Sequence, residues 1–419
     1  MFRTASIVAA IAVFTLTAAG AEPMSPDARK AWDKGFELMQ KGEHVEAFKH
    51  FETAMQLAPQ AYEVWTEYVV CLRKLNRLPR SAKAGWQAVQ LAPEKHEAWN
   101  TLGNTFLACH AWDQAYGCFL MVDRLAPDKA WAARNHLALA YRLWEHGRCE
   151  RAREVFRHAA SVDPTNGLPL VDQGALLFHM DKANMQQAKG LVAQGIYLIR
   201  TRGTPDQLLH ANHILAQIDG GETYSPGWSA NVSWQPLPAE LLAMPKEGAL
   251  ARLSVPGSAE RHYLLPKGDT VCLTTPEAWW ERLGDDSPWG HFFTMQFGPV
   301  EGSDFQVLWS ARYAQKSDAE VREQAQRVLN TALPTAVETN VPLVPVEAEH
   351  SKGFAFCITD KNHRGADAPP GDYPFLISIT LQTGNIRSLI TVLSQTKDPA
   401  FIQRMLDLWK GLRYRDKPD

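Results

Sequence analysis

The sequence predicts a multidomain protein, in which an all-α solenoid of helical repeats precedes an α+β domain with an antiparallel sheet covered by helices. Three observations predict this order. A sequence motif that ends in proline recurs through the first half of the chain. Two glycines at 220–221 mark the end of this repeat pattern, and short runs of strand-forming residues follow from residue 261. Self-similarity at a fixed period is the signature of stacked repeats, whereas short apolar runs between turn residues are typical of strands.

Composition limits the classes of function. The chain has 419 residues, of which 45% are hydrophobic and 21% charged, and its net charge is -3. Such a chain buries enough apolar surface to fold and is not a disordered segment. A nucleic-acid partner is not expected, because phosphate backbones require a clustered excess of Lys and Arg. Six cysteines are too few for a disulfide scaffold in a chain of this length.

The first 21 residues have the pattern of a secretory signal peptide. Arg3 supplies the positive start, residues 7–16 are apolar, and Ala19-Gly20-Ala21 has small residues where a signal peptidase cleaves. We expect cleavage after Ala21 and secretion, with the periplasm as the compartment. The alternative is an uncleaved anchor, since the apolar stretch approaches the length of a membrane span. No later stretch is long and apolar enough, so no membrane span is expected in the mature chain.

The recurring phrase predicts pairs of antiparallel helices. Before each proline, small and large residues recur where two helices must touch, such as Gly103 and Phe119 in the third unit. The glycine lets the bulky ring on the partner helix approach closely, and the proline ends the second helix because it lacks an amide proton. The first three prolines lie 34 residues apart and the fourth follows after 37: Pro59, Pro93, Pro127 and Pro164.

This pattern resembles the tetratricopeptide repeat family, and the resemblance covers about residues 28–164. It implies helix pairs that stack into a curved solenoid. The second unit has Val69, Ser81 and Gly85 in place of the usual small and aromatic residues, so looser packing is expected there. A fifth pair and a further amphipathic helix complete this domain, which we place at residues 22–219.

In this family the first helix of each pair lines the concave side of the solenoid. The resemblance therefore implies a groove whose Asn, Arg and aromatic side chains suit an extended or helical peptide. One version of the family grips a C-terminal carboxylate with Lys, Asn and Arg. Here Asn104 matches one position of that clamp, but Trp32, Thr66 and Asn100 stand where its lysine would be. The implied groove residues are Arg29, Trp32, Phe36, Met39, Thr66, Val70, Arg73, Asn100, Asn104, Arg134, Tyr141 and Trp144.

The second half has a different composition. Residues 220–254 are rich in proline and glycine and are interpreted as a linker, and residues 255–419 form the second predicted domain. Two short runs that flank a turn at 266–269 predict a hairpin. The elements expected in this domain are strands over 262–265, 270–274, 292–297, 305–313, 353–359, 375–380 and 386–393, and helices over 317–333 and 398–412.

The order of these elements resembles the PsbP-like α/β/α sandwich. The resemblance covers about residues 255–415 and rests on the phrase Phe354-Ala-Phe-Cys-Ile-Thr-Asp360, the strand ending at Leu393-Ser394, and the final helix. That family includes binding and assembly proteins, and it has no common catalytic residue to carry over to this sequence. The resemblance therefore implies a sheet between helices and no particular reaction.

No motif for a reaction or a cofactor stands out. The sequence has no glycine loop of the Walker or dinucleotide type, and Ser229 lacks the second glycine of a nucleophile elbow. His210 and His213 favour an exposed helix face over a metal site, because no further ligands lie nearby in the sequence. We therefore expect no catalytic residue, cofactor or metal. Cys272 and Cys357 lie mid-strand and leave two alternatives open, a disulfide between two strands or two buried free thiols.

The leading functional hypothesis is a non-enzymatic adaptor or assembly factor of the cell envelope, which holds a protein or peptide partner in the solenoid groove. The alternative is an enzyme with its active site in the C-terminal domain and repeats that recruit substrate. That alternative requires a pocket where titratable groups with shifted pKa values converge. A structural spacer with both faces of the solenoid covered is a third alternative.

Overall fold

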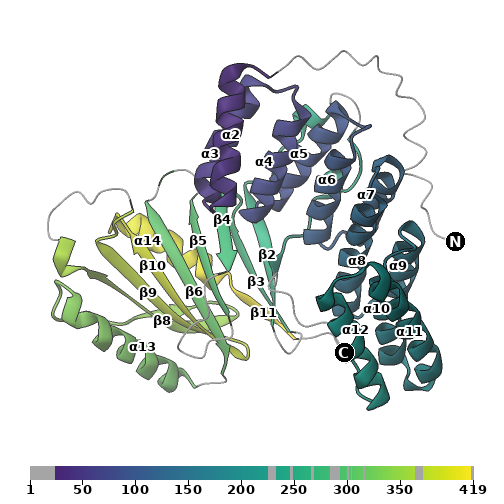
Figure 1. Ribbon diagram of the computed structural model, residues 1–419. Coiled ribbons are helices and arrows are strands. Elements are labelled where there is room, and N and C mark those ends of the chain that lie inside the picture. The colour runs from purple at the N-terminus through teal and green to yellow at the C-terminus, as the bar shows by residue number, and fades with distance from the viewer. Residues whose placement is uncertain are drawn as a thin grey trace.

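The computed structural model describes residues 24–224, 233–245, 249–265, 269–283, 293–299, 302, 304–314, 317–363 and 371–416. It confirms the predicted fold class, since stacked helices precede antiparallel sheets with helices (Figure 1). The predicted signal peptide, residues 1–21, lies outside the described residues. Within the described ranges, no helix combines the length and the apolar character that crossing a bilayer requires.

The helical half is a stack of helix pairs. The pairs are α2 (Pro26–Gln40) with α3 (His44–Leu57), α4 (Tyr62–Lys74) with α5 (Leu78–Leu91), α6 (His96–Ala108) with α7 (Trp112–Leu125), α8 (Lys129–Glu145) with α9 (Cys149–Val162), and α10 (Leu168–Met180) with α11 (Met185–Arg202). The last helix, α12 (Pro205–Asp219), packs on α10 and α11. First helices of successive pairs contact one another, α2 with α4, α4 with α6 and α6 with α8. Since the inner side of a curved stack is the shorter one, these contacts place the first helices on the concave side.

Small residues set how closely the helices of a pair approach. A Cβ atom added to Gly103 on α6 would lie only 2.6 Å from Cε1 of Phe119 on α7, so a side chain does not fit there. The second unit is also closely packed, contrary to the expectation of looser packing. Ser81 is fully buried, and its hydroxyl oxygen lies 2.9 Å from that of Thr105 in the third unit.

Replacing Gly103 with valine tests this close approach. We expect Gly103→Val to lower the free energy of unfolding by about 2–3 kcal/mol, because the added carbons overpack the contact with Phe119. The matched control is Gly190→Val on α11, where nothing lies within 4 Å of an added Cβ. The control should change stability by less than about 0.5 kcal/mol. Urea denaturation measures both variants, and equal losses would contradict the packing argument.

The C-terminal half contains two antiparallel sheets. The smaller has the strand order β1-β2-β3-β11 and the larger the order β4-β5-β6-β10-β9-β8-β7. The predicted hairpin is confirmed as β2 and β3, in which Leu264 pairs with Thr270. The strands are β1 (Ser233–Trp234), β2 (Ser258–Leu264), β3 (Thr270–Pro276), β4 (Trp279–Leu283), β5 (Phe293–Pro299), β6 (Phe305–Tyr313), β7 (Val344–Glu347), β8 (Ser351–Thr359), β9 (Phe375–Thr383), β10 (Ile386–Ser394) and β11 (Arg413–Arg415).

Helices cover both faces of the larger sheet. Side chains alternate between the two faces of a strand, and on β9 Ile377 and Ile379 belong to the core that contains α14 (Pro399–Lys410). Leu376 belongs instead to the cluster formed with α13 (Asp318–Ala332). The core on the α14 side is shared with the smaller sheet, and in it the rings of Trp309 and Trp409 lie 5.4 Å apart. The expected helix-covered sheet is confirmed, and the second sheet is an addition that the sequence did not predict.

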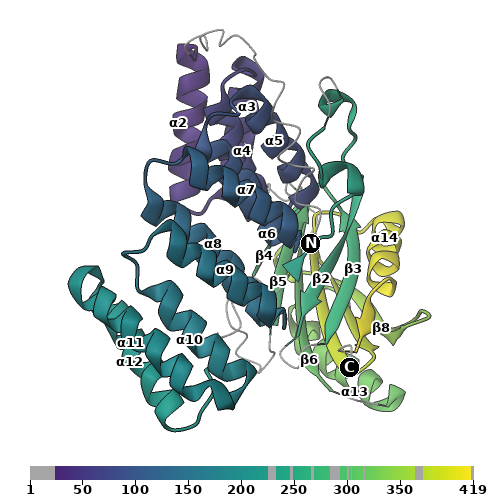
Figure 2. The ribbon, with the colours of Figure 1, turned by 90° about the vertical axis from the view of Figure 1, so that its right-hand side faces the viewer.

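The C-terminal half docks on the turns between the helices of a pair. At the turn between α4 and α5, Arg77 and Glu277 form an ion pair with 2.8 Å between Nη2 and Oε2. The amide of Glu281 donates to the carbonyl of Leu75 at the same turn, over 3.1 Å. Trp234 of β1 stacks on a residue of the next turn, His110, with ring centroids 4.5 Å apart. The two halves accordingly lie side by side (Figure 2).

The predicted linker, residues 220–254, contains structure that packs on the solenoid. Besides β1, it contains the 3-10 turns η3 (Ala239–Leu241) and η4 (Leu250–Arg252), and both contact α5. The indole of Trp86 on α5 donates to the carbonyl of Leu241 over 2.9 Å, and the ammonium of Lys83 donates to the carbonyl of Leu253. The described part of this segment is therefore held along α5.

The Arg77–Glu277 ion pair offers a test of the docking. The two side chains are only 3% and 8% exposed. We expect Arg77→Ala to lower the free energy of unfolding by about 3–5 kcal/mol, because it leaves a buried carboxylate without its cation. The double variant Arg77→Met/Glu277→Leu removes both charges and should regain most of that stability. Denaturant unfolding compares them, and a double variant as unstable as the single one would show that the charges do not account for the loss.

Candidate functional site

Three residues at the start of the solenoid form an aromatic surface, termed the α2 patch: Arg29, Trp32 and Phe36. Their i, i+3, i+7 spacing places them on one face of α2. The rings of Trp32 and Phe36 stack with centroids 5.7 Å apart, and the guanidinium of Arg29 lies 4.7 Å from the Trp32 ring centroid. Phe36 nevertheless remains 40% exposed. The patch therefore presents an ordered but uncovered aromatic ring, as the groove prediction requires.

In the middle of the first-helix face, polar side chains bond within their own helices. The amide of Asn104 donates to the main-chain carbonyl of Asn100 over 2.9 Å and to its Oδ1 over 3.1 Å. The hydroxyl of Thr66 donates to the carbonyl of Glu63 over 2.8 Å, and Thr66 is only 7% exposed. Thr66 is therefore a packing residue, which corrects its predicted place in the groove.

The C-terminal end of the face is closed. The hydroxyl of Tyr141 on α8 donates to the fully buried carboxylate of Asp172 on α10. Trp144 is only 4% exposed, and its ring centroid lies 5.8 Å from that of Tyr224, which follows α12. Tyr141 and Trp144 thus belong to an internal cluster, which corrects their predicted role as free groove residues. Their partners lie far along the chain and gave no local signal.

His210 contributes to the same cluster. Its Nε2 lies 3.0 Å from Oδ1 of Asp172, and this hydrogen bond raises the pKa of His210. The sequence had suggested an exposed helix face, a description that fits the neighbouring His213 but not His210. The remaining predicted groove residues, all exposed or half-buried, are Arg29, Trp32, Phe36, Met39, Val70, Arg73, Asn100, Asn104 and Arg134.

One set of titratable groups converges in the C-terminal half. Glu260 and His262 lie on one face of β2, and Cys272 of β3 pairs with His262 across the strands. Nε2 of His262 is 2.7 Å from Oε1 of Glu260, and its Nδ1 is 3.5 Å from the Cys272 sulfur. This order of groups is one that activates a thiol nucleophile. Cys272 is fully buried, however, and burial raises the pKa of its thiol, so it does not meet the requirement for an accessible thiolate.

The cysteines follow the free-thiol alternative. Cys272 lies on β3 of the smaller sheet and Cys357 on β8 of the larger sheet, and both are free. The disulfide that the sequence left open is therefore not formed. The strands that carry the two residues belong to different sheets, a fact that mid-strand positions alone do not reveal.

Histidines gather where the two halves meet. The rings of His110 and His146 lie 4.3 Å apart, and the Trp234 ring that stacks on His110 lies 5.0 Å from the His262 ring. Burial lowers the pKa of His110 to about 2, and the charges of His146, Arg142 and His262 act in the same direction. Burial is also the largest cause that lowers the pKa values of His146 and His262. At neutral pH, imidazoles whose pKa values are lowered in this way carry no charge.

Acid is expected to weaken the docked state. As the pH falls below about 6.5, an imidazole in the unfolded chain binds a proton that the folded His110 does not bind. The stabilising contribution is thus complete above pH 6.5 and is lost as the pH falls. Thermal unfolding between pH 7.5 and 4.5 measures the loss. His110→Asn, which suits the backbone φ of 57° at this position, should flatten the profile relative to the unaltered protein; an identical profile would contradict this assignment.

No family model and no curated relative matches the chain. Solved structures similar to its helical half include MamA from Desulfovibrio magneticus RS-1, at 18% identity and a TM-score of 0.35, with 43% of this chain and 99% of that chain covered. YrrB, a TPR protein with an unusual peptide-binding site, has 16% identity and a TM-score of 0.33, with 45% and 92% covered. A thermophilic TPR protein from Thermus thermophilus has 16% identity and a TM-score of 0.32, with 45% of this chain and 99% of that chain covered.

The PsbP-like resemblance of residues 255–415 stays a prediction.

Proposed function

We propose that this protein is a non-enzymatic adaptor or assembly factor of the cell envelope, which binds a protein or peptide partner on the first-helix face of its solenoid. The observation that carries the proposal is the α2 patch. Its stacked Trp32 and Phe36 rings are already ordered, so a partner that covers Phe36 immobilises few side chains on binding. Aromatic and arginine side chains also dominate the energetics of protein interfaces.

The chemistry of the face indicates the class of partner. The α2 patch offers apolar area beside Arg29, whose guanidinium pairs with Asp33 on the same helix over 3.1 Å. Arg134 near the start of α8 offers a second, exposed cation. Asn100 and Asn104 lie between them on α6, with amide groups of the kind that bond a peptide main chain. An extended or helical peptide with an apolar side chain and a carboxylate fits this order of groups. Since Tyr224 closes the far end, the partner would contact the first four helix pairs.

The compartment and the second domain complete the proposal. The leader predicted at residues 1–21 supports a place in the cell envelope. The C-terminal half holds the turns of the solenoid by the contacts of Arg77 and His110, so it would keep the first-helix face in one shape. It would also present a second surface to the assembly.

Substitution of Phe36 tests the proposed binding face. We expect Phe36→Ala to lower the amount of partner captured by crosslinking in intact cells by on the order of tenfold, as loss of a hot-spot side chain does. The melting temperature should change by less than about 2 °C, because the Phe36 ring is 40% exposed and belongs to no buried core cluster of the described residues. The matched control is Tyr197→Ala on α11, a second-helix residue that is 70% exposed.

Mass spectrometry of the crosslinked products identifies and quantifies the partner. Asn104→Ala, whose amide bonds only within α6 in the described structure, provides a second variant on the same face. Equal capture by Phe36→Ala, Asn104→Ala and Tyr197→Ala would overturn the proposal.

A further inference from the structure

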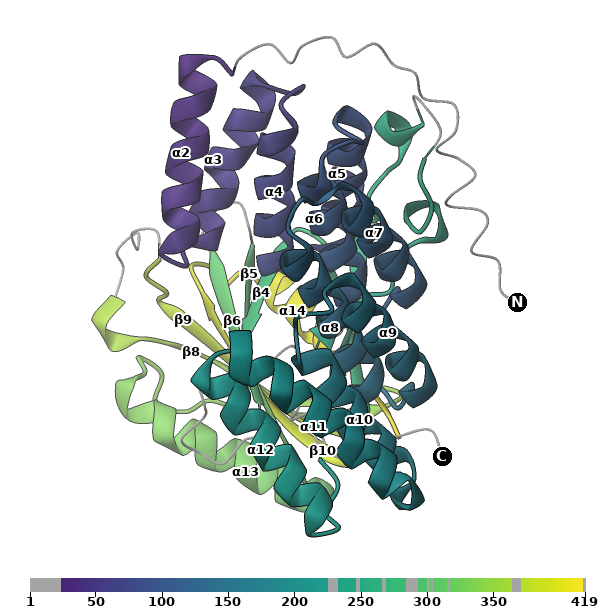
Figure 3. The same cartoon turned by 45° about the vertical axis from the view of Figure 1, so that its right-hand side comes forward.

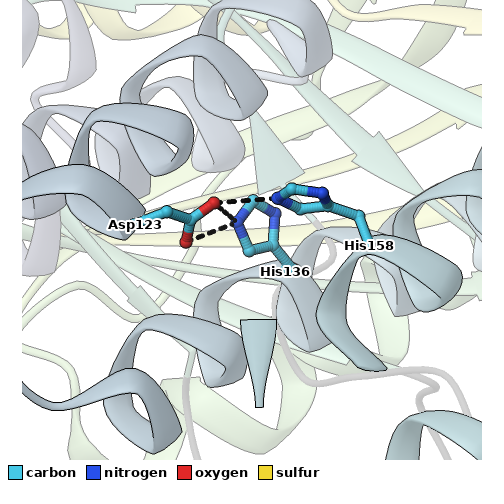
Figure 4. Close-up of side chains that lie close together, drawn as sticks. All are labelled: Asp123, His136 and His158. Carbon is cyan, nitrogen blue, oxygen red and sulfur yellow. Dashed lines mark hydrogen bonds and ion pairs between the residues drawn. The ribbon is translucent and has the colours of Figure 1, made fainter. Parts of the chain in front are cut away.

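Three side chains from different helices meet between the third and fourth units of the solenoid (Figure 4). They are Asp123 on α7, His136 on α8 and His158 on α9. Nε2 of His136 lies 3.0 Å and 2.9 Å from the two carboxylate oxygens of Asp123. Nε2 of His158 lies 2.8 Å from Oδ2 of the same carboxylate. Both imidazoles therefore point their Nε2 atoms at the carboxylate of Asp123.

The neighbouring repeats fill the position of His136 with tryptophan. Trp65, Trp99 and His136 each lie 28 residues before the proline that closes their own unit. The indoles of Trp65 and Trp99 donate to the carbonyls of Pro59 and Pro93, each over 2.8 Å. The stacking of repeats is thus satisfied by an apolar ring at this position. The histidine, with an acid and a second histidine facing it, is a departure that stacking does not require.

The spacing of the three groups fits a tetrahedral metal ion. Zinc binds imidazole nitrogen and carboxylate oxygen at about 2.0–2.2 Å, so ligand atoms around it lie about 3.3 Å apart. The nitrogen–oxygen distances here are 2.8–3.0 Å, and all three ligand atoms lie within 4.8 Å of one another. The nitrogen–oxygen distances would lengthen by a few tenths of an ångström to admit the ion.

The cluster is also accessible to solvent. The side chain of His136 is fully buried, whereas Asp123 is 14% and His158 28% exposed, so a fourth ligand position can face water.

We propose that Asp123, His136 and His158 form a binding site for a divalent transition-metal ion of the zinc class. The ion would replace the hydrogen bonds of the cluster with three coordinate bonds and would join α7 of the third unit to α8 and α9 of the fourth. Two imidazoles, one carboxylate and a water complete the four ligands that zinc prefers. None of these residues belongs to the α2 patch, so this site is independent of the proposed partner binding.

Titration of the metal-free full chain with Zn²⁺ in a calorimeter tests the proposal. We expect the unaltered protein to bind one Zn²⁺ ion per chain tightly. His158→Gln should lose more than about 100-fold in zinc affinity, since loss of an outer-shell partner alone already costs 10–100-fold. Asp123→Asn, which keeps the size of the side chain, should lose the same equivalent. The matched control is His213→Gln, an exposed histidine on α12 outside the cluster. Cys272→Ser removes the sulfur ligand of the other His-containing group, Glu260–His262–Cys272.

The outcomes separate an ion site from a hydrogen-bonded cluster alone. Retention of the tight equivalent in His213→Gln and Cys272→Ser, with its loss in His158→Gln and Asp123→Asn, supports the proposal. A zinc Kd weaker than about 10 μM in the unaltered protein would overturn it, because structural zinc sites bind far more tightly. Unchanged zinc binding in both cluster variants would overturn it as well. Circular dichroism without zinc verifies folding, and if His158→Gln is unfolded, Asp123→Asn decides.

Discussion

The close contact between a small residue on one helix and an aromatic ring on its partner is the constraint on which the rest of the structure depends. Gly103 has no side chain, so α6 and α7 approach until the ring of Phe119 fills the space above it. Gly35 and Phe51 make the same contact in the first pair. The second pair departs from this contact, with Val69 and Gly85 at the positions of Gly103 and Phe119. Because the first and third pairs share the contact and the units follow at a fixed period, equivalent positions recur at equivalent places along the array. The first-helix face follows from that regularity, and Figure 3 shows the stack of helices that presents it.

The turns between paired helices are free to vary, and the C-terminal half makes use of this freedom. The repeat pattern constrains the helices, whereas two of the turns present different residues to the second domain: Arg77 forms an ion pair, and His110 stacks on Trp234. Docking on turns leaves side chains of the first helices outside these contacts, among them the exposed ring of Phe36. The spacer hypothesis requires both faces of the solenoid to be covered. The end where Tyr224 packs on Trp144 meets that requirement, whereas α2, with the exposed ring of Phe36, does not.

Local sequence signals predicted most of the fold, and the missed elements are those without such signals. The helix pairs, the β2–β3 hairpin and the helix that follows Ser317 all have turn, cap or period signals within a few residues, and the Ser317 side chain does accept from the amide of Glu320. Four strands were missed, β1, β4, β7 and β11, and each has only two to five residues. β1 has two residues inside a proline-rich stretch, and β7 has four with Pro345 among them. Their pairing depends on strands elsewhere in the chain, and no periodicity develops over so few residues.

The same distinction explains which site residues were predicted. The α2 patch could be predicted because its contacts lie within one helix, whereas Tyr141 and Trp144 were misassigned because Asp172 and Tyr224 reach them from later elements. The metal-ligand cluster has no local motif, since its three residues are spread over three helices. In a repeat protein, however, equivalent positions of different units can be compared, and the residues that the units share indicate what stacking alone requires. Where His136 replaces the tryptophan of two preceding units, the difference between units marks chemistry that the common fold does not need.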